Sequence, residues 1–177
     1  MVTPDLKRRV EQLFLDDANT FGCAETALVV LQEHFALPGA GDSSAAMALN
    51  GGIAYSGGMC GAITGAALAV GRLAGRLIPD HARAKSEARR LTQALIADFA
   101  REYGATGCRE LSGYDFMEPG RHHAFIESGV WRDACLRQIQ FAVEVMSRLV
   151  AAADWARATI PPGPHAVSPP SLAPPPP

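Results

Sequence analysis

The sequence predicts an all-α fold, a compact helical bundle with a glycine-rich central helix. Apolar residues recur every three or four positions over several long segments, which is the spacing of one face of an α-helix. No segment alternates apolar and polar residues as a half-buried β-strand does. Glycine and proline fall between the periodic segments, where they end helices. A chain of 177 residues, 48% of them hydrophobic, is long enough to form the core of one domain.

Two helices are expected near the N-terminus, at residues 3–16 and 22–35. In the first, Val10 and Phe14 fall on one face at helical spacing. The second helix carries a longer apolar stripe, made of Ala24, Ala27, Leu28, Leu31 and Phe35. Proline and glycine at residues 38–41 then end the regular structure.

A short helix at residues 43–49 and a long one at residues 60–77 are expected next. Glycine pairs at 51–52 and 57–58 lie between them and require unusual backbone angles there. The long segment itself contains Gly61, Gly65, Gly71 and Gly75. Because glycine lowers helix propensity, this content predicts that another backbone packs closely against the helix.

Three further helices are expected at residues 81–103, 108–111 and 131–155. The first of these is amphipathic, with Leu91 and Leu95 on its apolar face and many charges on the other. These segments complete a helical domain that spans residues 1–155.

Two segments are expected to lack regular structure. Residues 116–131, with His122 and His123, are interpreted as a polar connection in which the histidines are solvated. Residues 156–177 are expected to form a disordered tail, since nine of the 13 prolines fall between positions 161 and 177.

Charge and hydropathy exclude several classes of function. A net charge of −2 gives no basic surface for nucleic acid. The longest run of apolar and small residues, 59–71, is too short to span a bilayer and is followed by Arg72 and Arg76. The first residues lack the apolar stretch of a signal peptide, so we expect a cytoplasmic protein.

The candidate functional residues are the four cysteines, Cys23, Cys60, Cys108 and Cys135. The cytosol is reducing, so structural disulfides are not expected. The cysteines are instead interpreted as ligands, redox groups or inert buried thiols.

Three of the cysteines, Cys23, Cys60 and Cys108, lie at or near predicted helix N-termini. Free backbone N–H groups and the helix dipole stabilise an anion there, so we expect the pKa of these thiols to fall below about 8.5. Cys135 lies in the first turns of the last helix, where Arg132 would pair with negative charge on a cluster.

The spacing of the cysteines excludes several familiar sites. No C-x-x-C pair is present, which argues against thioredoxin-like and zinc-ribbon sites. No C-x-x-C-H is present either, so covalent haem is excluded. Single cysteines on four helices can nevertheless form one site inside a bundle.

Three other side chains near the cysteines have expected supporting roles. Glu25, two positions after Cys23, is expected to stabilise the helix dipole. Tyr55 and Ser56 lie in the glycine-rich loop before Cys60, where a hydroxyl would donate a hydrogen bond to sulfur.

Four segments, each with one cysteine, resemble the cysteine segments of one protein family and occur in the same order. Residues 60–65, CGAITG, match the pattern C-G-A-x-x-G, and residues 21–28, FGCAETAL, are similar to the first cysteine segment. Residues 107–111, GCREL, are similar to the third, and Cys135 supplies the fourth. Over residues 6–149 the chain resembles the C_GCAxxG_C_C family of redox-active proteins. Split-Soret cytochrome c has a similar region, but its haem function does not carry over because the haem motif is missing here.

The resemblance implies a redox-active protein whose four cysteines act at one site. The leading interpretation is an iron–sulfur cluster bound by all four thiolates and used for electron transfer. The backbone near Gly61 would supply N–H donors to its sulfur atoms. Four thiolates would also suit Zn²⁺ or Cu(I).

Two alternatives stay open from the sequence. One is thiol–disulfide exchange without a metal, in which Cys60 attacks and another cysteine such as Cys23 resolves. The other is a helical binding or structural module with inert thiols scattered through the core. The site is expected near the N-terminal end of the 60–77 helix. An unknown redox partner is implied, and the glycine-rich face would suit a homo-oligomer.

Overall fold

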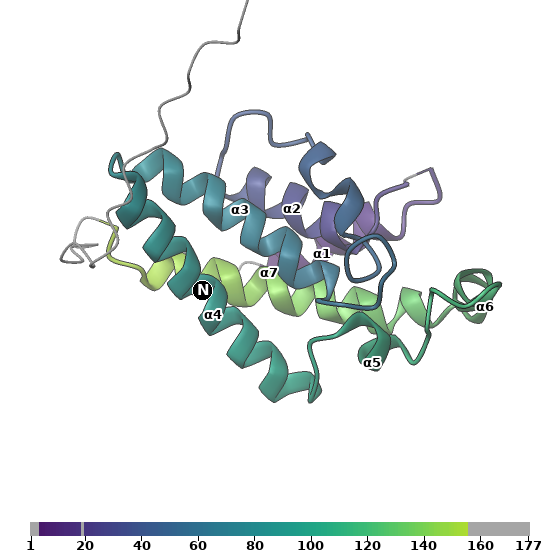
Figure 1. The fold of residues 1–177 in the computed structure, drawn as a ribbon. Coiled ribbons are helices and arrows are strands. Elements are labelled where there is room, and N and C mark those ends of the chain that lie inside the picture. Colours follow the sequence, from purple (N-terminus) through teal and green to yellow (C-terminus); the bar gives the residue numbers. More distant parts are fainter. Residues whose placement is uncertain (1–3, 19, 156–177) are drawn as a thin grey trace, which may run out of the picture.

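The computed structural model describes residues 4–18 and 20–155 and confirms the all-α prediction. Within these residues there is no β-strand, and Met59 and Gly107 form a single isolated bridge. Figure 1 shows the long helices packed along one another, with the short α5 and α6 toward one end. In chain order the elements are α1 (Pro4–Phe14), α2 (Cys23–His34), the 3-10 helix η1 (Ser44–Leu49), α3 (Gly61–Leu77), α4 (His81–Tyr103), α5 (Cys108–Ser112), α6 (Arg121–Ser128), the 3-10 helix η2 (Val130–Arg132) and α7 (Ala134–Ala152).

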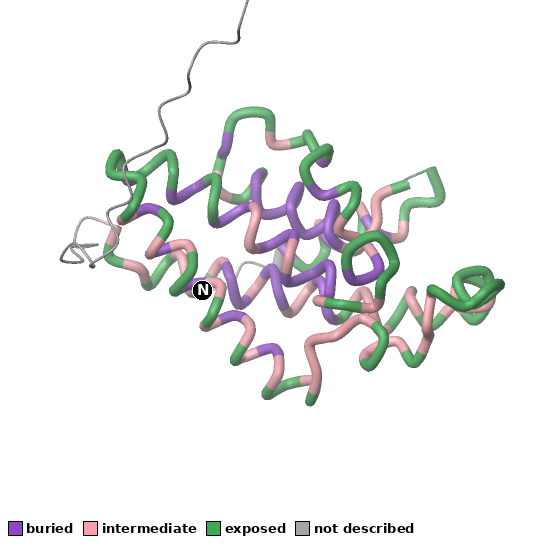
Figure 2. Tube along the Cα trace, viewed as in Figure 1, coloured by how far each residue is buried: buried purple, intermediate pink, exposed green. Residues whose placement is uncertain are grey.

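Helix α2 is enclosed by the rest of the bundle. Every residue from Ala24 to Gln32 is buried, so α2 has no solvent-facing stripe over this length. Helix α3 lies along α2, and α7 packs against α1, α2, α3 and α4. Figure 2 shows the buried residues gathered where these helices face one another. The core is therefore continuous from α1 to α7.

Two of the predicted packing glycines, Gly61 and Gly65, bring α3 close to α2. A Cβ on Gly61 would collide with the Cys23 sulfur, and one on Gly65 would collide with the Ala24 carbonyl oxygen. The prediction of close packing is confirmed at these two positions. It is wrong for Gly71 and Gly75, where a Cβ would face open space with no neighbouring atom within 4 Å.

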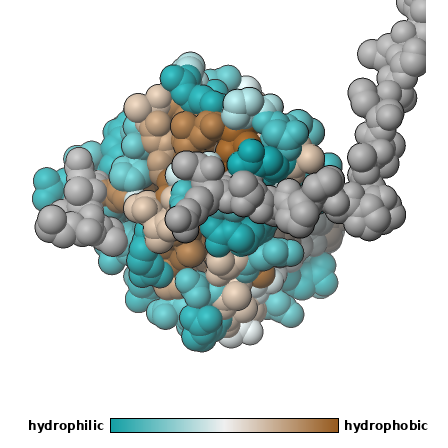
Figure 3. All heavy atoms as spheres, turned by 90° about the vertical axis from the view of Figure 1, so that its left-hand side faces the viewer, coloured by the Kyte–Doolittle hydropathy of each residue, from teal (hydrophilic) through white to brown (hydrophobic). Residues whose placement is uncertain are grey.

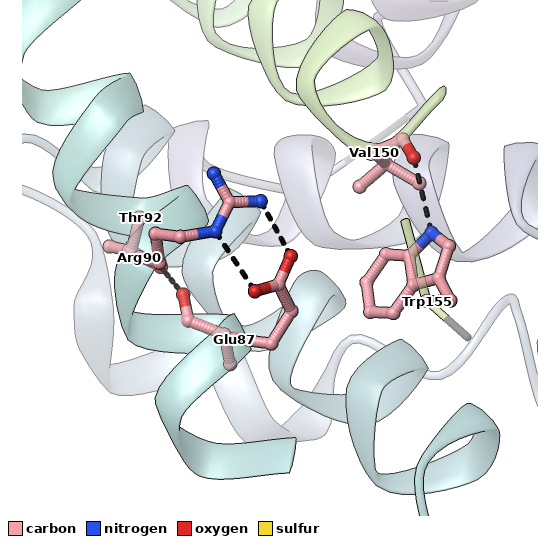
Figure 4. Close-up of polar contacts among 6 residues, drawn as sticks. Glu87, Arg90, Thr92, Val150 and Trp155 are labelled. Atoms are coloured by element: carbon pink, nitrogen blue, oxygen red, sulfur yellow. Dashed lines mark hydrogen bonds and ion pairs between the residues drawn. The ribbon is translucent and has the colours of Figure 1, made fainter. Parts of the chain in front are cut away.

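The last helix is shorter than the 131–155 segment predicted for it. It begins at Ala134 after the 3-10 turn and ends at Ala152, because the backbone of Ala153 is extended. Trp155 folds back, and its indole N–H donates a 3.1 Å hydrogen bond to the Val150 carbonyl (Figure 4). The indole also packs against a small apolar cluster formed by Ala74, Ile78 and Ala84. This contact holds Trp155 against α3 and α4.

The same end of the bundle carries an ion pair on α4. The Arg90 Nε donates a 2.9 Å hydrogen bond to the nearly buried Glu87 carboxylate (Figure 4). Figure 3 shows this end of the molecule, where hydrophilic residues surround smaller hydrophobic areas. One exposed apolar side chain here is Leu77 at the end of α3.

The connection at 116–131 is not a loop throughout, so its interpretation as a polar connection is corrected. It contains α6, which lies between Gly120 and Gly129, both with left-handed backbone angles. Helix α6 has no buried residue, and its apolar content is limited to neighbouring positions such as Phe125 and Ile126. That pattern is too short for a recognisable helical stripe.

The predicted disordered tail, residues 156–177, lies outside the described residues. In the part of the chain that is described, no helix has the length and apolar character needed to cross a bilayer.

Candidate functional site

All four cysteines lie at the beginning of a helix. Cys23 and Cys108 are the first residues of α2 and α5, and Cys60 is the residue that precedes α3. Cys135, expected deeper in the last helix, is the second residue of α7. The four helices therefore direct their N-terminal ends, with their free N–H groups, toward the sulfur-bearing residues.

Backbone hydrogen bonds hold the Cys60 and Cys108 segments side by side. The Cys60 N–H donates to the Thr106 carbonyl at 2.8 Å, and the Cys108 N–H donates to the Gly58 carbonyl at 2.7 Å. These bonds flank the isolated bridge between Met59 and Gly107. The starts of α3 and α5 are thus fixed relative to each other.

Cys23 also contacts the start of α3. Its sulfur lies against Gly61, where no larger residue could fit. Backbone groups of Gly51, Ala24 and Gly61 form hydrogen bonds that favour its thiolate. A backbone donor at Gly61 thus faces a cysteine sulfur, and its role toward a cluster stays a prediction.

Three of the thiols share one cavity. Cys23, Cys108 and Cys135 line a cavity with a volume of about 370 Å³. Cys60 is only 4% exposed and is not among the residues that line it. Its thiol instead donates a long hydrogen bond of 3.9 Å to the Gln138 amide oxygen. An anion at Cys23, Cys108 or Cys135 raises the pKa of Cys60, so all four sulfurs lie within electrostatic reach of one another.

The expected lowering of the thiol pKa values is wrong. Burial raises the pKa of all four thiols, that of Cys108 to about 12, and an anion at Cys23 raises it further at the other three. Hydrogen bonds from backbone groups oppose this rise at Cys23 but are outweighed by the loss of hydration. Without a cation, the site therefore holds neutral thiols at neutral pH.

The thiols are neither bonded to one another nor arranged for a single ion. All four cysteines are free. Among the described residues, no three side chains of Cys, His, Asp or Glu are gathered closely enough to hold one metal ion.

A buried polar network supports Cys23, and it includes Glu25, which lies in the first turn of α2 as expected. The Glu25 carboxylate accepts hydrogen bonds from the Ser43 hydroxyl at 3.0 Å and the Asn50 amide at 2.8 Å. The Asn50 amide oxygen in turn accepts from the Ala24 N–H at 3.0 Å and from the Cys23 thiol at 3.8 Å. Asn50 was not singled out in the sequence, because Asn before two glycines ordinarily indicates only a turn.

The glycine-rich loop contains a left-handed turn. Gly51, Gly52, Ile53, Ala54 and Tyr55 all have φ between 51° and 76°. The two glycines confirm the unusual backbone angles predicted there. The other three residues also have left-handed backbone angles, which are unfavourable for a residue with a Cβ. The turn places Tyr55 in the cavity wall.

The two adjacent histidines have different surroundings. His122 lines the cavity, and its ring centre lies 4.7 Å from that of Tyr55. His123 points toward Glu127, with 3.2 Å between nitrogen and oxygen. Both are exposed, as expected, but His122 belongs to the cavity wall, which its position in the sequence did not indicate. Arg132 lines the cavity as well.

Comparison with known proteins yields one match. A family model described as "Putative redox-active protein (C_GCAxxG_C_C)" matches residues 21–149, which include all four cysteines. Searches of curated proteins and of solved structures found no match.

Proposed function

Because the chain belongs to the C_GCAxxG_C_C family of redox-active proteins, we propose that its four cysteines bind an iron–sulfur cluster that serves electron transfer. The observation that carries the proposal is the convergence of the thiols. Cys23, Cys108 and Cys135 line one cavity, and Cys60 lies buried beside them within electrostatic reach. Inert thiols would be expected in separate parts of the core.

The donor set fits such a group. Four cysteine thiolates are the usual ligands of both common cluster types. A tetrahedral ion with bonds of about 2.3 Å would hold its sulfur ligands only about 4 Å apart. In the described residues no ligand group is that compact. A cluster of two or four irons carries its own sulfide and therefore takes thiolates that stand farther apart, which favours it over Zn²⁺.

The bound group would supply reversible one-electron chemistry at a partly buried site. The chain's own residues would hold and tune it. Backbone N–H groups of Gly51 and Gly61 would offset negative charge on the Cys23 sulfur. Arg132, at the cavity, would add positive charge. Deprotonation of four thiols whose pKa values are raised would accompany metal binding, so assembly should release protons.

Thiol–disulfide exchange is the second candidate, and one observation favours it. Backbone hydrogen bonds from Gly51, Ala24 and Gly61 offset part of the rise that burial causes in the pKa of Cys23, which also lines the cavity. In this alternative Cys23, rather than the more deeply buried Cys60, would attack. Two thiols would give two protons and two electrons to an oxidised partner and form one disulfide.

The two candidates are separated by metal analysis. We would purify the full chain without oxygen, reconstitute it with iron and sulfide, and measure iron, acid-labile sulfide and visible absorption. Each Cys→Ser variant should lose most of the bound iron, whereas His123→Ala should retain it because His123 is not among the residues that line the cavity. Absence of iron and sulfide from a folded, reconstituted chain would refute the cluster. In that case Cys23→Ser should abolish exchange with a small disulfide substrate.

A further inference from the structure

We propose that the aromatic part of the cavity binds a neutral, planar organic molecule of the quinone class beside the thiols. The proposal rests on the proposed redox function for its chemical meaning, because it names the class of molecule with which the site would exchange electrons. It concerns binding, and its support comes from the cavity walls.

Aromatic side chains are concentrated at this cavity. The chain has seven phenylalanines, three tyrosines and two tryptophans. Six of these twelve residues line the cavity: Phe14, Phe21, Tyr55, Phe116, Phe125 and Trp131. They come from distant parts of the sequence, so folding brings them together here. Four thiolates around a cluster do not require such a wall, whereas an organic ring does.

The aromatic rings of the cavity wall contact one another mostly edge to face. Phe116 meets Phe125 at 5.1 Å between ring centres with an angle of 74° between the planes. Tyr55 meets Phe116 at 5.8 Å and 80°. Each edge-to-face contact covers one face of one ring, and Phe116 also stacks on Tyr114 at 6.4 Å with 8° between the planes. A planar ligand can stack on a ring face that these contacts leave open, which a branched aliphatic molecule cannot do.

The volume of the cavity suits one small ring system. Its volume of about 370 Å³ lies at the lower end of small-molecule sites, which span roughly 300–1,000 Å³. The thiols of Cys23, Cys108 and Cys135 line the same space. A ring system bound against the aromatic wall would lie next to the sulfur atoms.

The charges at the cavity favour a neutral ligand. Asp16 and Asp17 line it and repel anions. Arg132, which also lines it, already lies over the Trp131 ring at 4.5 Å and 4.0 Å from the Asp17 carboxylate. The guanidinium is thus already engaged, so a phosphate-bearing cofactor would have to compete with Asp17 for it.

Polar donors suit the carbonyl oxygens of a quinone. Tyr55 carries a hydroxyl and His122 a ring nitrogen, and both side chains belong to the cavity wall. A neutral quinone presents two carbonyl acceptors on a planar apolar body. That combination matches apolar faces with a few polar groups, as in most small-molecule sites.

The probe is 2,3-dimethyl-1,4-naphthoquinone, whose methyl groups block thiol addition to the quinone ring. Binding would be measured by calorimetry and by quenching of tryptophan fluorescence, with the full chain kept without oxygen, before and after reconstitution with iron. We expect saturable binding. Phe125→Leu should weaken it roughly 3- to 10-fold through loss of a stacking face, while Phe35→Leu, at the opposite end of α2, should leave it unchanged.

Two further ligands test the proposal on the unmodified chain, so the result does not depend on whether a variant folds. The saturated decahydronaphthalene-1,4-dione and the anionic naphthalene-2-sulfonate should each bind the unmodified chain at least 10-fold more weakly than the quinone. Absence of saturable quinone binding, or equal binding of the saturated diketone, would overturn the proposal. Quinone binding without iron uptake would refute only the cluster, and iron uptake without quinone binding would refute only this inference.

Discussion

The side-chain amide of Asn50 donates a 2.8 Å hydrogen bond to the buried carboxylate of Glu25. This contact orients Asn50 so that its oxygen faces the Ala24 N–H and the Cys23 thiol. The loop before α3 is thereby tied to the start of α2. The position of Cys23 thus depends on a polar pair that carries no sulfur itself.

Glu25→Gln should destabilise the protein by about 1–3 kcal/mol. Glutamine keeps one acceptor oxygen, so its NH2 group would face either the Ser43 hydroxyl or the Gly22 N–H, which now donate to different oxygens of the carboxylate. The free energy of unfolding in urea measures this change. Glu33→Gln is the matched control, because Glu33 forms a surface ion pair with Arg9 and should cost less than about 1 kcal/mol. Equal losses in both variants would contradict the supporting role of the network.

The long helices were predictable because each carries an apolar stripe that meets the core. Helix α6 was missed, since Phe125 and Ile126 are adjacent and form no repeat. The glycines at positions 120 and 129 could have indicated its two ends.

The site was predictable only in part. The four cysteines could be selected from their types and their places at helix starts. Their raised pKa values could not be predicted, because the burial of Cys60 and Cys108 depends on which helices pack over them. Asn50 and His122 reach the site through tertiary contacts that no local spacing predicts.

Gly61→Ala should destabilise the protein by about 1–3 kcal/mol and reduce iron uptake. The added methyl group would collide with the Cys23 sulfur and approach the Ala24 backbone, so α2 and α3 would have to separate. Gly71→Ala is the matched control on the same helix. Its methyl group would face open space, so helix propensity should raise the free energy of unfolding by up to about 1 kcal/mol. Changes of the same sign in both variants would argue against close packing at Gly61.

The metal-free, reduced protein should lose stability as pH rises above 9. Burial raises the pKa of Cys108 from its ordinary value of 9.0 to about 12. Between these values the unfolded chain releases the thiol proton and the folded chain keeps it. The unfolded state then binds fewer protons, so the free energy of unfolding falls with increasing pH.

Urea unfolding at several pH values between 7.5 and 10.5 measures this fall. Other groups also titrate in this range, so the comparison is between the unmodified chain and Cys108→Ser. The serine variant should show a slope that is shallower by up to about 1 kcal/mol per pH unit. Identical slopes would mean that Cys108 ionises equally easily in both states.

Ala54→Gly should stabilise the protein by about 1 kcal/mol, against the usual direction of an alanine-to-glycine change. Ala54 has φ of 51°, inside the left-handed turn, where a Cβ is unfavourable. Glycine relieves this cost and keeps the 2.7 Å backbone hydrogen bond from residue 54 to the Ala48 carbonyl. Ala97→Gly, at an exposed position of α4, is the control and should destabilise by up to about 1 kcal/mol. Urea unfolding of the two variants should therefore give opposite signs. Destabilisation by both would show that the turn at residues 51–55 is not left-handed in solution, and the placement of Tyr55 in the cavity wall would fail with it.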